Sequence, residues 1–254
     1  MAGRVRLYIT GATGYLGSEV ARQAGWVGER VEVLDADAVY EAVAGCDAVI
    51  HTAYRKDDAR VNVEGSANVA RAAAAHGARL VHMSTDLVYA GDLGRAVGED
   101  DPVAPLDAYG QSKALAEWEV AAACPSAVLV RTSLIYGGAE PAPHERMAQE
   151  PGARFYEDEI RCPIQVGDLA AAVLELAERP EIAGPLNVAG SDAVTRWEFA
   201  SLITGRDDLP GRGGRREDRE TSRWTARARR RCCAPRCGVR GPCSASRPSE
   251  ACRR

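Results

Sequence analysis

Tyr109 and Lys113 are the two residues whose types and spacing most directly suggest chemistry in this sequence. They stand four residues apart in a segment, residues 107–117, that is expected to be helical, so the phenol and the ammonium would share one face. A free tyrosine titrates near pH ~10, and a neighbouring positive charge lowers that pKa. Such a pair can make a tyrosine a general acid/base. The same spacing also occurs by chance on ordinary helices, so the interpretation depends on the surrounding elements.

A glycine-rich segment near the N-terminus supplies the first of these elements. Residues 4–10 are expected to form a short buried strand, a Gly-x-x-Gly-x-x-Gly turn follows at 11–17, and a helix should continue from residue 18. This order is the context that a phosphate-binding turn requires. Gly11 would permit the tight turn, Gly14 would let a pyrophosphate approach the backbone, and Gly17 would let helix and strand pack closely. The first N–H groups of the helix would face the phosphates.

Polar residues at the end of a second apolar segment supply the other element. Residues 79–86 read as a strand that ends in Ser84, Thr85 and Asp86. In an open α/β sheet, ligands bind beyond the carboxyl ends of the strands, which would place these side chains at the mouth of the site. The alternative is that they cap the following turn.

The alternation of strand and helix patterns predicts an α/β fold, a Rossmann-like doubly wound parallel sheet with a small, truncated C-terminal substrate lobe. The expected division is a dinucleotide-binding domain at 1–138, a substrate lobe at 139–209 interleaved with the last sheet elements, and a tail at 210–254. No apolar run approaches the about 18 residues of a membrane span. The N-terminus leads straight into a strand with no signal peptide, so a cytoplasmic location is the default expectation.

The tail differs in composition from the rest of the chain. Residues 211–254 hold 14 Arg, no Lys and 4 acidic residues, a charge of +10, whereas the remainder carries −14 and the whole chain −4. Five of the eight cysteines also lie there. A nucleic-acid-binding arm would need more aromatic residues than Trp224, and a zinc site would need more than the pair Cys233 and Cys237. The favoured hypothesis is an out-of-frame, disordered segment, with neither nucleic acid nor metal bound.

Together these segments resemble the extended short-chain dehydrogenase/reductase superfamily, and within it dTDP-4-dehydrorhamnose reductase and its sugar-nucleotide-binding relatives. The resemblance covers roughly residues 4–205 and stops near 205–210. The matching stretches are residues 10–17, 47–53, 61–68, 83–89, 109–117, 130–137 and 162–170.

The resemblance implies a hydride-transfer site. Tyr109 would exchange a proton with the substrate oxygen, Lys113 would lower the tyrosine pKa and hold the nicotinamide ribose, and Thr85 would hydrogen-bond the same oxygen. Ser84, Asp86 and Arg131 are the expected substrate contacts, although an ion pair is an equally good interpretation of Arg131. The residues expected to bind the NADP or NAD cofactor, besides Lys113, are Gly11, Thr13, Gly14, Tyr15, Leu16, Gly17, Asp35, Ala36, His51, Ala53 and Tyr54.

The segment between the first helix and residue 48 is shorter than the family pattern. It has room for one strand, residues 30–34, where the family has two. This strand is either the second, with Asp35 on the ribose 2′-hydroxyl, or the third, with Asp35 and Ala36 near the adenine and the second strand missing. The third-strand assignment is favoured, and the choice between NAD and NADP is then unreadable. Asp35 would also serve as the N-cap of a helix from residue 36.

The main hypothesis is therefore an NAD(P)-dependent reductase of a 4-keto nucleotide sugar. A 4,6-dehydratase would need a carboxylate after Asp86, where this chain has Leu87. An NAD-dependent sugar-nucleotide epimerase uses a similar set of residues and stays open, as does a non-catalytic or inactive cofactor-binding relative. The partners would be the nucleotide sugar and, as one option, a second copy in a homodimer.

Overall fold

A five-stranded parallel sheet forms the centre of the molecule, in the order β1-β2-β3-β4-β9. The structure is a computed structural model that describes residues 5–91 and 95–213. The predicted α/β, Rossmann-like parallel sheet is confirmed. Of the predicted disordered tail at 210–254, residues 214–254 lie outside the described residues, whereas Gly211–Arg212 form a short strand paired with Phe155–Tyr156, so the prediction is wrong at the start of the tail. The sheet strands are β1 (Leu7–Thr10), β2 (Ala48–His51), β3 (Arg79–Thr85), β4 (Val128–Thr132) and β9 (Gly184–Asn187).

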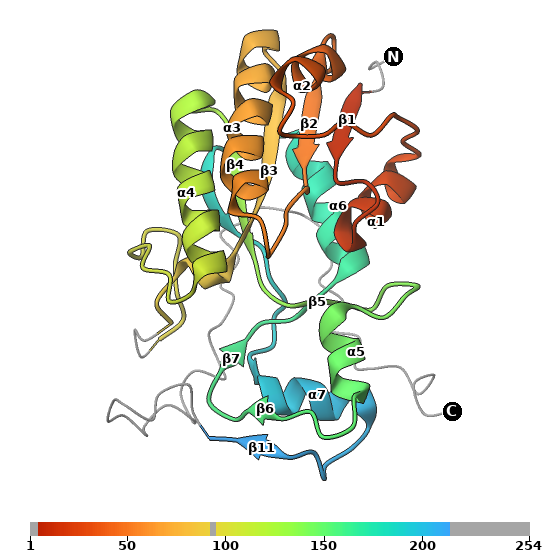
Figure 1. The fold of residues 1–254 in the computed structure, drawn as a ribbon, viewed down its shortest axis with the longest axis vertical. Coiled ribbons are helices and arrows are strands. Elements are labelled where there is room, and N and C mark those ends of the chain that lie inside the picture. Colours follow the sequence, from red (N-terminus) through yellow and green to blue (C-terminus); the bar gives the residue numbers. More distant parts are fainter. Residues whose placement is uncertain (1–4, 92–94, 214–254) are drawn as a thin grey trace.

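Helices cover both faces of this sheet (Figure 1). Three of them pack side by side on one face around a valine- and alanine-rich core, and two pack on the other face against the opposite side of the same strands. Strands that are buried on both faces explain the continuous apolar runs from which they were predicted. The first group is α2 (Ala36–Val43), α3 (Ala59–His76) and α4 (Ala108–Ala123), and the second is α1 (Tyr15–Ala24) and α6 (Val166–Ala177).

A smaller lobe lies beyond the carboxyl ends of the strands (Figure 1). It has its own apolar cluster, in which the side chains of Phe155, Ala200 and Leu209 are buried. The segments that build the lobe and connect it to the sheet are η1 (Asp86–Val88), β5 (Ile135–Tyr136), α5 (Pro143–Gln149), β6 (Phe155–Tyr156), β7 (Ile160–Arg161), β8 (Ile164–Gln165), β10 (Val194–Thr195), α7 (Arg196–Thr204) and β11 (Gly211–Arg212).

Residues 30–34 are not a strand, and this corrects both assignments made from the sequence. They form an irregular connection between α1 and α2, and β1 pairs with β2 alone. Val33 is nevertheless buried, and its carbonyl accepts a hydrogen bond from Asn68 Nδ2 at 3.0 Å. Both strands that the family pattern places in this interval are thus absent from the described sheet, and at the outer edge of β1 the indole Nε1 of Trp26 donates to the carbonyl of Leu7 at 2.9 Å.

Side-chain caps begin several helices, as the sequence predicts for Asp35. Asp35 accepts from Ala38 N at 3.0 Å and begins α2, and Asp107 accepts from Gly110 N at 2.7 Å and begins α4. In the sequence Asp168 resembles a helix N-cap before residues 169–176, but it is not the cap in the structure. Gln165 is the N-cap of α6, and its Oε1 accepts from the N–H groups of Gly167 and Asp168.

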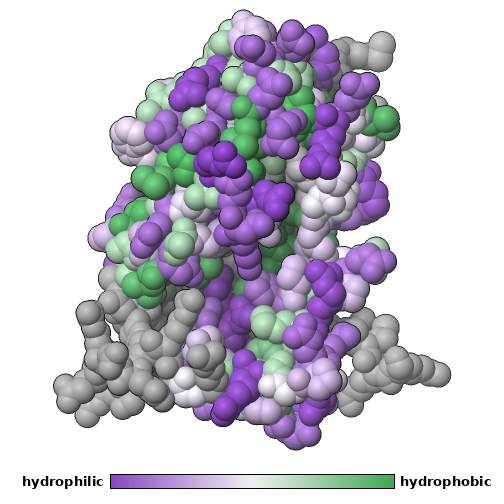
Figure 2. Space-filling view, viewed as in Figure 1, coloured by the Kyte–Doolittle hydropathy of each residue, from purple (hydrophilic) through white to green (hydrophobic). Residues whose placement is uncertain are grey.

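Hydrophilic residues cover most of the surface seen in Figure 2, with apolar residues in small groups between them. In the part of the chain that the structure describes, no helix has both the length and the hydropathy to cross a membrane.

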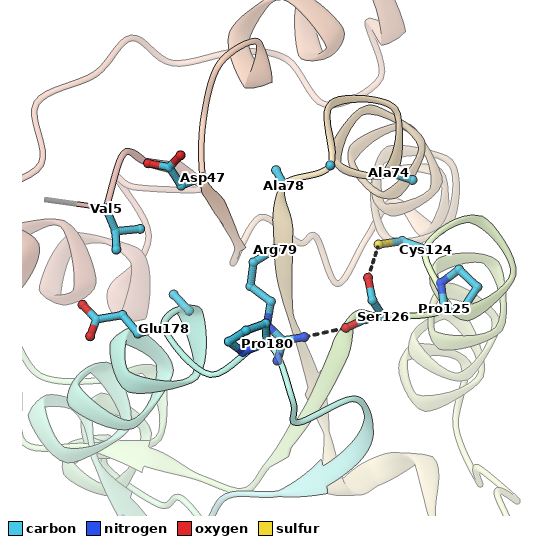
Figure 3. A pocket seen from close by; sticks show the side chains of 12 residues that line it. Val5, Asp47, Ala74, Ala78, Arg79, Cys124, Pro125, Ser126, Glu178 and Pro180 are labelled. Atoms are coloured by element: carbon cyan, nitrogen blue, oxygen red, sulfur yellow. Dashed lines mark hydrogen bonds between the residues drawn. The ribbon is translucent and has the colours of Figure 1, made fainter. Parts of the chain in front are cut away.

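Arg79 closes the opposite end of the sheet, where the strands begin. It is 8% exposed, and its guanidinium donates to the carbonyls of Leu176, Ser126 and Ile182. The Leu176 carbonyl lies in the last turn of α6, where the helix dipole leaves partial negative charge, and Ser126 and Ile182 lie in the loops that follow α4 and α6. Figure 3 shows Arg79 pointing between Pro180 and Ser126 in a hollow of about 520 Å³. The arginine therefore supplies donors to the carbonyls of Ser126 and Ile182, while that of Leu176 also accepts from Arg179 N–H at 3.2 Å.

Replacing Arg79 with Met should keep much of the side-chain volume and remove all three donors. We expect the free energy of unfolding to fall by roughly 3 kcal/mol, because buried acceptors are left unpaired. Urea denaturation of the variant and wild type would measure this change. Arg71→Met on the exposed side of α3 is the matched control and should change stability by less than about 0.5 kcal/mol. Equal losses in both variants would contradict the assigned role of Arg79.

Candidate active site

The glycine turn has the close contacts that its sequence predicts. Gly11 adopts a φ of +70°, and a Cβ there would lie 2.6 Å from the backbone N of Ala53. A Cβ on Gly17 would lie 2.1 Å from the carbonyl oxygen of Gly11, so α1 packs directly on the turn. A Cβ on Gly14 would meet only Gly11 O, at 3.2 Å, and Gly14 N–H donates to that oxygen at 2.8 Å. The backbone at Gly14 is thus accessible to a ligand, as a pyrophosphate-binding turn requires.

A single cavity of about 1340 Å³ joins this turn to the predicted acid/base residues. It lies at the carboxyl ends of β1, β2, β3 and β4 and is closed on the far side by residues of α5, β6, β7 and α7. Thr85, Tyr109 and Lys113 all line it, and so does the whole turn from Gly11 to Gly17. The structure therefore brings together segments that lie about a hundred residues apart in the sequence.

Tyr109 lies in the first turn of α4 and is partly exposed to the cavity. Burial raises the pKa of its phenol, and the nearby Tyr54 and Asp86 raise it further, while Arg161 lowers it. The predicted lowering of this pKa by Lys113 is not found. The phenol consequently keeps its proton at neutral pH, which is the form that can donate to a substrate oxygen.

Lys113 is buried, with 3% of its surface exposed. Burial lowers the pKa of its ammonium to about 8, against the charge of Glu117, which raises it. Within the described residues, its Nζ makes no hydrogen bond to a protein group. It is thus a cation inside the cavity wall that is available to a ligand.

Thr85 is also at the cavity, 7% exposed, at the end of β3. Its Oγ1 accepts from Leu87 N–H at 3.2 Å and thereby caps the short helix η1. Both interpretations made from the sequence, a cap and a group at the mouth of the site, therefore apply to this hydroxyl.

Arg131 and Ser84 belong to a buried ion-pair network. Arg131 donates to both carboxylate oxygens of Glu117, with Nη2 2.6 Å from Oε2, and Ser84 Oγ donates to Glu117 Oε1 at 2.5 Å. Tyr89 completes the network, because its hydroxyl accepts from Arg131 Nη1 at 2.8 Å. Arg131 is 4% exposed and does not line the cavity, so the ion-pair interpretation describes it, and Ser84 lines the cavity with its hydroxyl already committed.

Asp86 reaches across to the small lobe. Its carboxylate pairs with Arg161 of β7 through two hydrogen bonds, at 2.9 and 2.5 Å, and Arg161 also contacts Glu159 at 3.0 Å. Arg161 lines the cavity together with Lys56, His144 and Arg196. The pKa of His144 is lowered to about 3, first by burial and then by the positive charges of these three cations. The sequence patterns gave no sign of these four residues, because they come from segments with little resemblance to the family.

The residues predicted for the adenosine side divide into two groups. Ala53 and Tyr54 line the cavity, together with Thr13, Tyr15 and Leu16 of the turn. Asp35 and Ala36 do not line it, because Asp35 serves as a cap and the expected strand end is absent. His51 is 1% exposed and lies between Thr10 Oγ1, at 2.6 Å, and Ser66 Oγ, at 3.0 Å, so it is an interior residue.

Comparison with known proteins gives the same family along most of the chain. Residues 5–231 match the model of the RmlD substrate binding domain, which extends beyond residues 205–210, where the sequence resemblance was expected to stop. A dTDP-4-dehydrorhamnose reductase of Mycobacterium tuberculosis is 36% identical over 231 residues, 80% of this chain and 76% of that protein. A methionine adenosyltransferase 2 subunit beta of Rattus norvegicus is 30% identical, covering 81% of this chain and 73% of that protein.

A solved structure has the same fold. The structure of dTDP-4-dehydrorhamnose reductase from Bacillus anthracis in complex with NADP superposes with a TM-score of 0.74 and 24% identity, over 84% of this chain and 86% of that one.

Gly17→Ala should disrupt the turn, because the added Cβ would overlap Gly11 O. We expect dinucleotide binding to be lost and the thermal midpoint to fall, since α1 must move away from β1. Gly14→Ala is the matched control for folding, because its Cβ would be 3.2 Å from the same oxygen. Calorimetry and a dinucleotide titration would separate the two effects. A Gly17→Ala protein with wild-type stability would contradict the close packing described here.

Lys113 should give the stability of the chain a distinct pH dependence. Its pKa is about 8 in the folded state and 10.5 ordinarily, so between these values the unfolded chain binds a proton that the folded chain does not. The free energy of unfolding should therefore rise from about pH 8 to 10.5, and Lys113→Met should flatten that rise. Denaturation at several pH values would test this, and parallel profiles for the two proteins would contradict it.

Proposed function

The chain belongs to the RmlD substrate binding domain family, and from this premise we propose that it reduces a 4-keto nucleotide sugar with NADPH or NADH. It would thus be an oxidoreductase of the extended short-chain dehydrogenase/reductase type. The single observation that carries this proposal is the shared cavity, which holds the glycine turn, Thr85, Tyr109 and Lys113. The named relative from M. tuberculosis is a reductase of this class.

The residues of the turn fit a dinucleotide. Gly11 and Gly17 let β1 and α1 pack closely. The backbone at Gly14, the N-cap of α1, is accessible to a ligand. Lys113 would hold the nicotinamide ribose, and its positive charge suits a polar ligand. The cofactor would supply the hydride, and the protein would supply orientation and electrostatics.

Tyr109 is the proposed proton donor. The phenol is protonated at neutral pH and would give its proton to the substrate carbonyl oxygen during reduction, although burial raises its pKa and makes it a weaker acid than free tyrosine. Thr85 would donate a hydrogen bond to the same oxygen and fix its position. Arg161 would keep the phenol's surroundings polar, because Asp86 and Glu159 hold it at the cavity wall.

A second candidate function is a non-catalytic, cofactor-binding subunit. The 30% identity to a protein named as a subunit, methionine adenosyltransferase 2 subunit beta, favours it, and so does the absence of two strands beside β1 in the described sheet. An epimerase would keep the same acid/base residues. Turnover of a 4-keto sugar nucleotide, with consumption of reduced cofactor, separates the reductase from both alternatives.

Tyr109→Phe removes the proposed proton donor and keeps the ring. Turnover should fall by roughly 10²- to 10⁴-fold, while the dissociation constant of reduced cofactor should stay nearly constant. Initial rates with a 4-keto nucleotide sugar would give the turnover number, and a titration followed by nicotinamide fluorescence would give the dissociation constant of the reduced cofactor. The control is Tyr40→Phe on α2, a half-exposed tyrosine that does not line the cavity. Unchanged turnover in Tyr109→Phe would exclude the assigned role.

A further inference from the structure

The outer side of β1 has no neighbouring strand in the described sheet. The carbonyls of Arg6 and Thr10 accept hydrogen bonds from the β2 side, so the alternate residue Leu7 turns its carbonyl outward. That carbonyl accepts a hydrogen bond from the indole Nε1 of Trp26, at 2.9 Å. A side chain thus takes the place of one ladder hydrogen bond of the missing strand.

Trp26 is held firmly in this position. Its backbone N–H donates to Ala21 O at 2.9 Å, and its ring meets Tyr8 edge-on, with centroids 5.9 Å apart and an interplanar angle of 85°. Tyr8 in turn donates to Glu29 O at 3.0 Å. Gly28 passes against the indole, since a Cβ there would lie 2.1 Å from Cζ2. The backbone of the segment after α1 runs beside β1 without regular secondary structure (Figure 1). The contacts of Trp26 and Tyr8 hold this segment, which forms a wall beside β1.

This wall belongs to the same cavity as the glycine turn. Trp26, Val27, Val31 and Leu34 line it, with the indole partly exposed and the Val27 side chain 98% exposed. The turn from Gly11 to Gly17 and Lys113 line the same cavity. A dinucleotide with its pyrophosphate at the turn and its nicotinamide toward Lys113 must direct its adenosine half to the side of β1 where a second strand would stand. In this chain that side is the Trp26 segment.

We infer that Trp26 and the segment that follows it, residues 26–34, form the adenosine-binding subsite of this chain in place of the absent second strand. The indole offers an aromatic surface on which an adenine can pack, and Val27 and Val31 add apolar contact. The inference rests on the proposed cofactor dependence, because it assigns one half of that cofactor to residues of this chain.

The test uses the two halves of the cofactor as separate probes. Calorimetric titration of the full chain with ADP, with nicotinamide mononucleotide and with NADPH gives three dissociation constants for each variant. Trp26→Ala should weaken ADP and NADPH binding by about tenfold or more and leave nicotinamide mononucleotide unchanged. Trp26→Phe, which keeps an aromatic ring but loses the donor to Leu7, should recover most of the ADP affinity. Trp118→Ala, at a 67% exposed tryptophan of α4, is the matched control and should change none of the three.

A second variant keeps the test valid if Trp26→Ala does not fold. Val27→Glu changes a side chain that is almost fully exposed, so it should leave the thermal midpoint unchanged while weakening ADP binding by charge repulsion and lost apolar contact. Wild-type ADP affinity in a folded Trp26→Ala or Val27→Glu protein would overturn the inference and leave the proposed function standing, provided that wild type binds NADPH. A wild-type chain that binds neither NADPH, NADH nor ADP would overturn both.

Discussion

The buried ion pair between Glu117 and Arg131 is the constraint on which the position of the proposed acid/base residues depends. Both side chains are nearly inaccessible, at 6% and 4% exposure, and burying such charges is tolerated only when each is paired and hydrogen-bonded. Glu117 lies one turn beyond Lys113 on α4, and its partners Arg131 and Ser84 come from two neighbouring strands. The pair therefore fixes the rotation of α4 about its axis, and with it the face that carries Tyr109 and Lys113 toward the cavity.

The phosphate-binding turn depends on a different and smaller set of contacts. Gly11 and Gly17 need only β1, α1 and the segment after β2, where Thr52 and Ala53 approach the turn. None of these elements involves the strands that are absent from the described sheet. Loss of those strands can thus leave the pyrophosphate position intact and alter the adenosine side alone, where Trp26 now covers the outer carbonyl of β1.

The parts of the fold and site that the sequence predicted correctly are those with local signals. The turn, the cap at Asp35, and the shared face of Tyr109 and Lys113 each follow from spacings of a few residues. Residues 30–34 were expected to be a strand because of their valines and leucine, but a strand also needs a partner, which no local pattern supplies. The ion pair of Asp86 and Arg161 spans 75 residues, and the raised pKa of Tyr109 follows from burial; neither has a local signature.

The positive charges that line the cavity affect how Tyr109 can transfer a proton. The protonated phenol of Tyr109 stands in a wall that also contains Lys113 and Arg161. Reduction of a carbonyl develops negative charge on its oxygen before the proton arrives, and positive groups in a sheltered cavity stabilise that charge more than water does. A phenol that holds its proton firmly gives it up only when a stronger base, such as an alkoxide, forms beside it. Because burial raises its pKa, Tyr109 is a weaker acid than free tyrosine, so proton transfer would depend on the strong base that forms beside it and on the positive charges of Lys113 and Arg161.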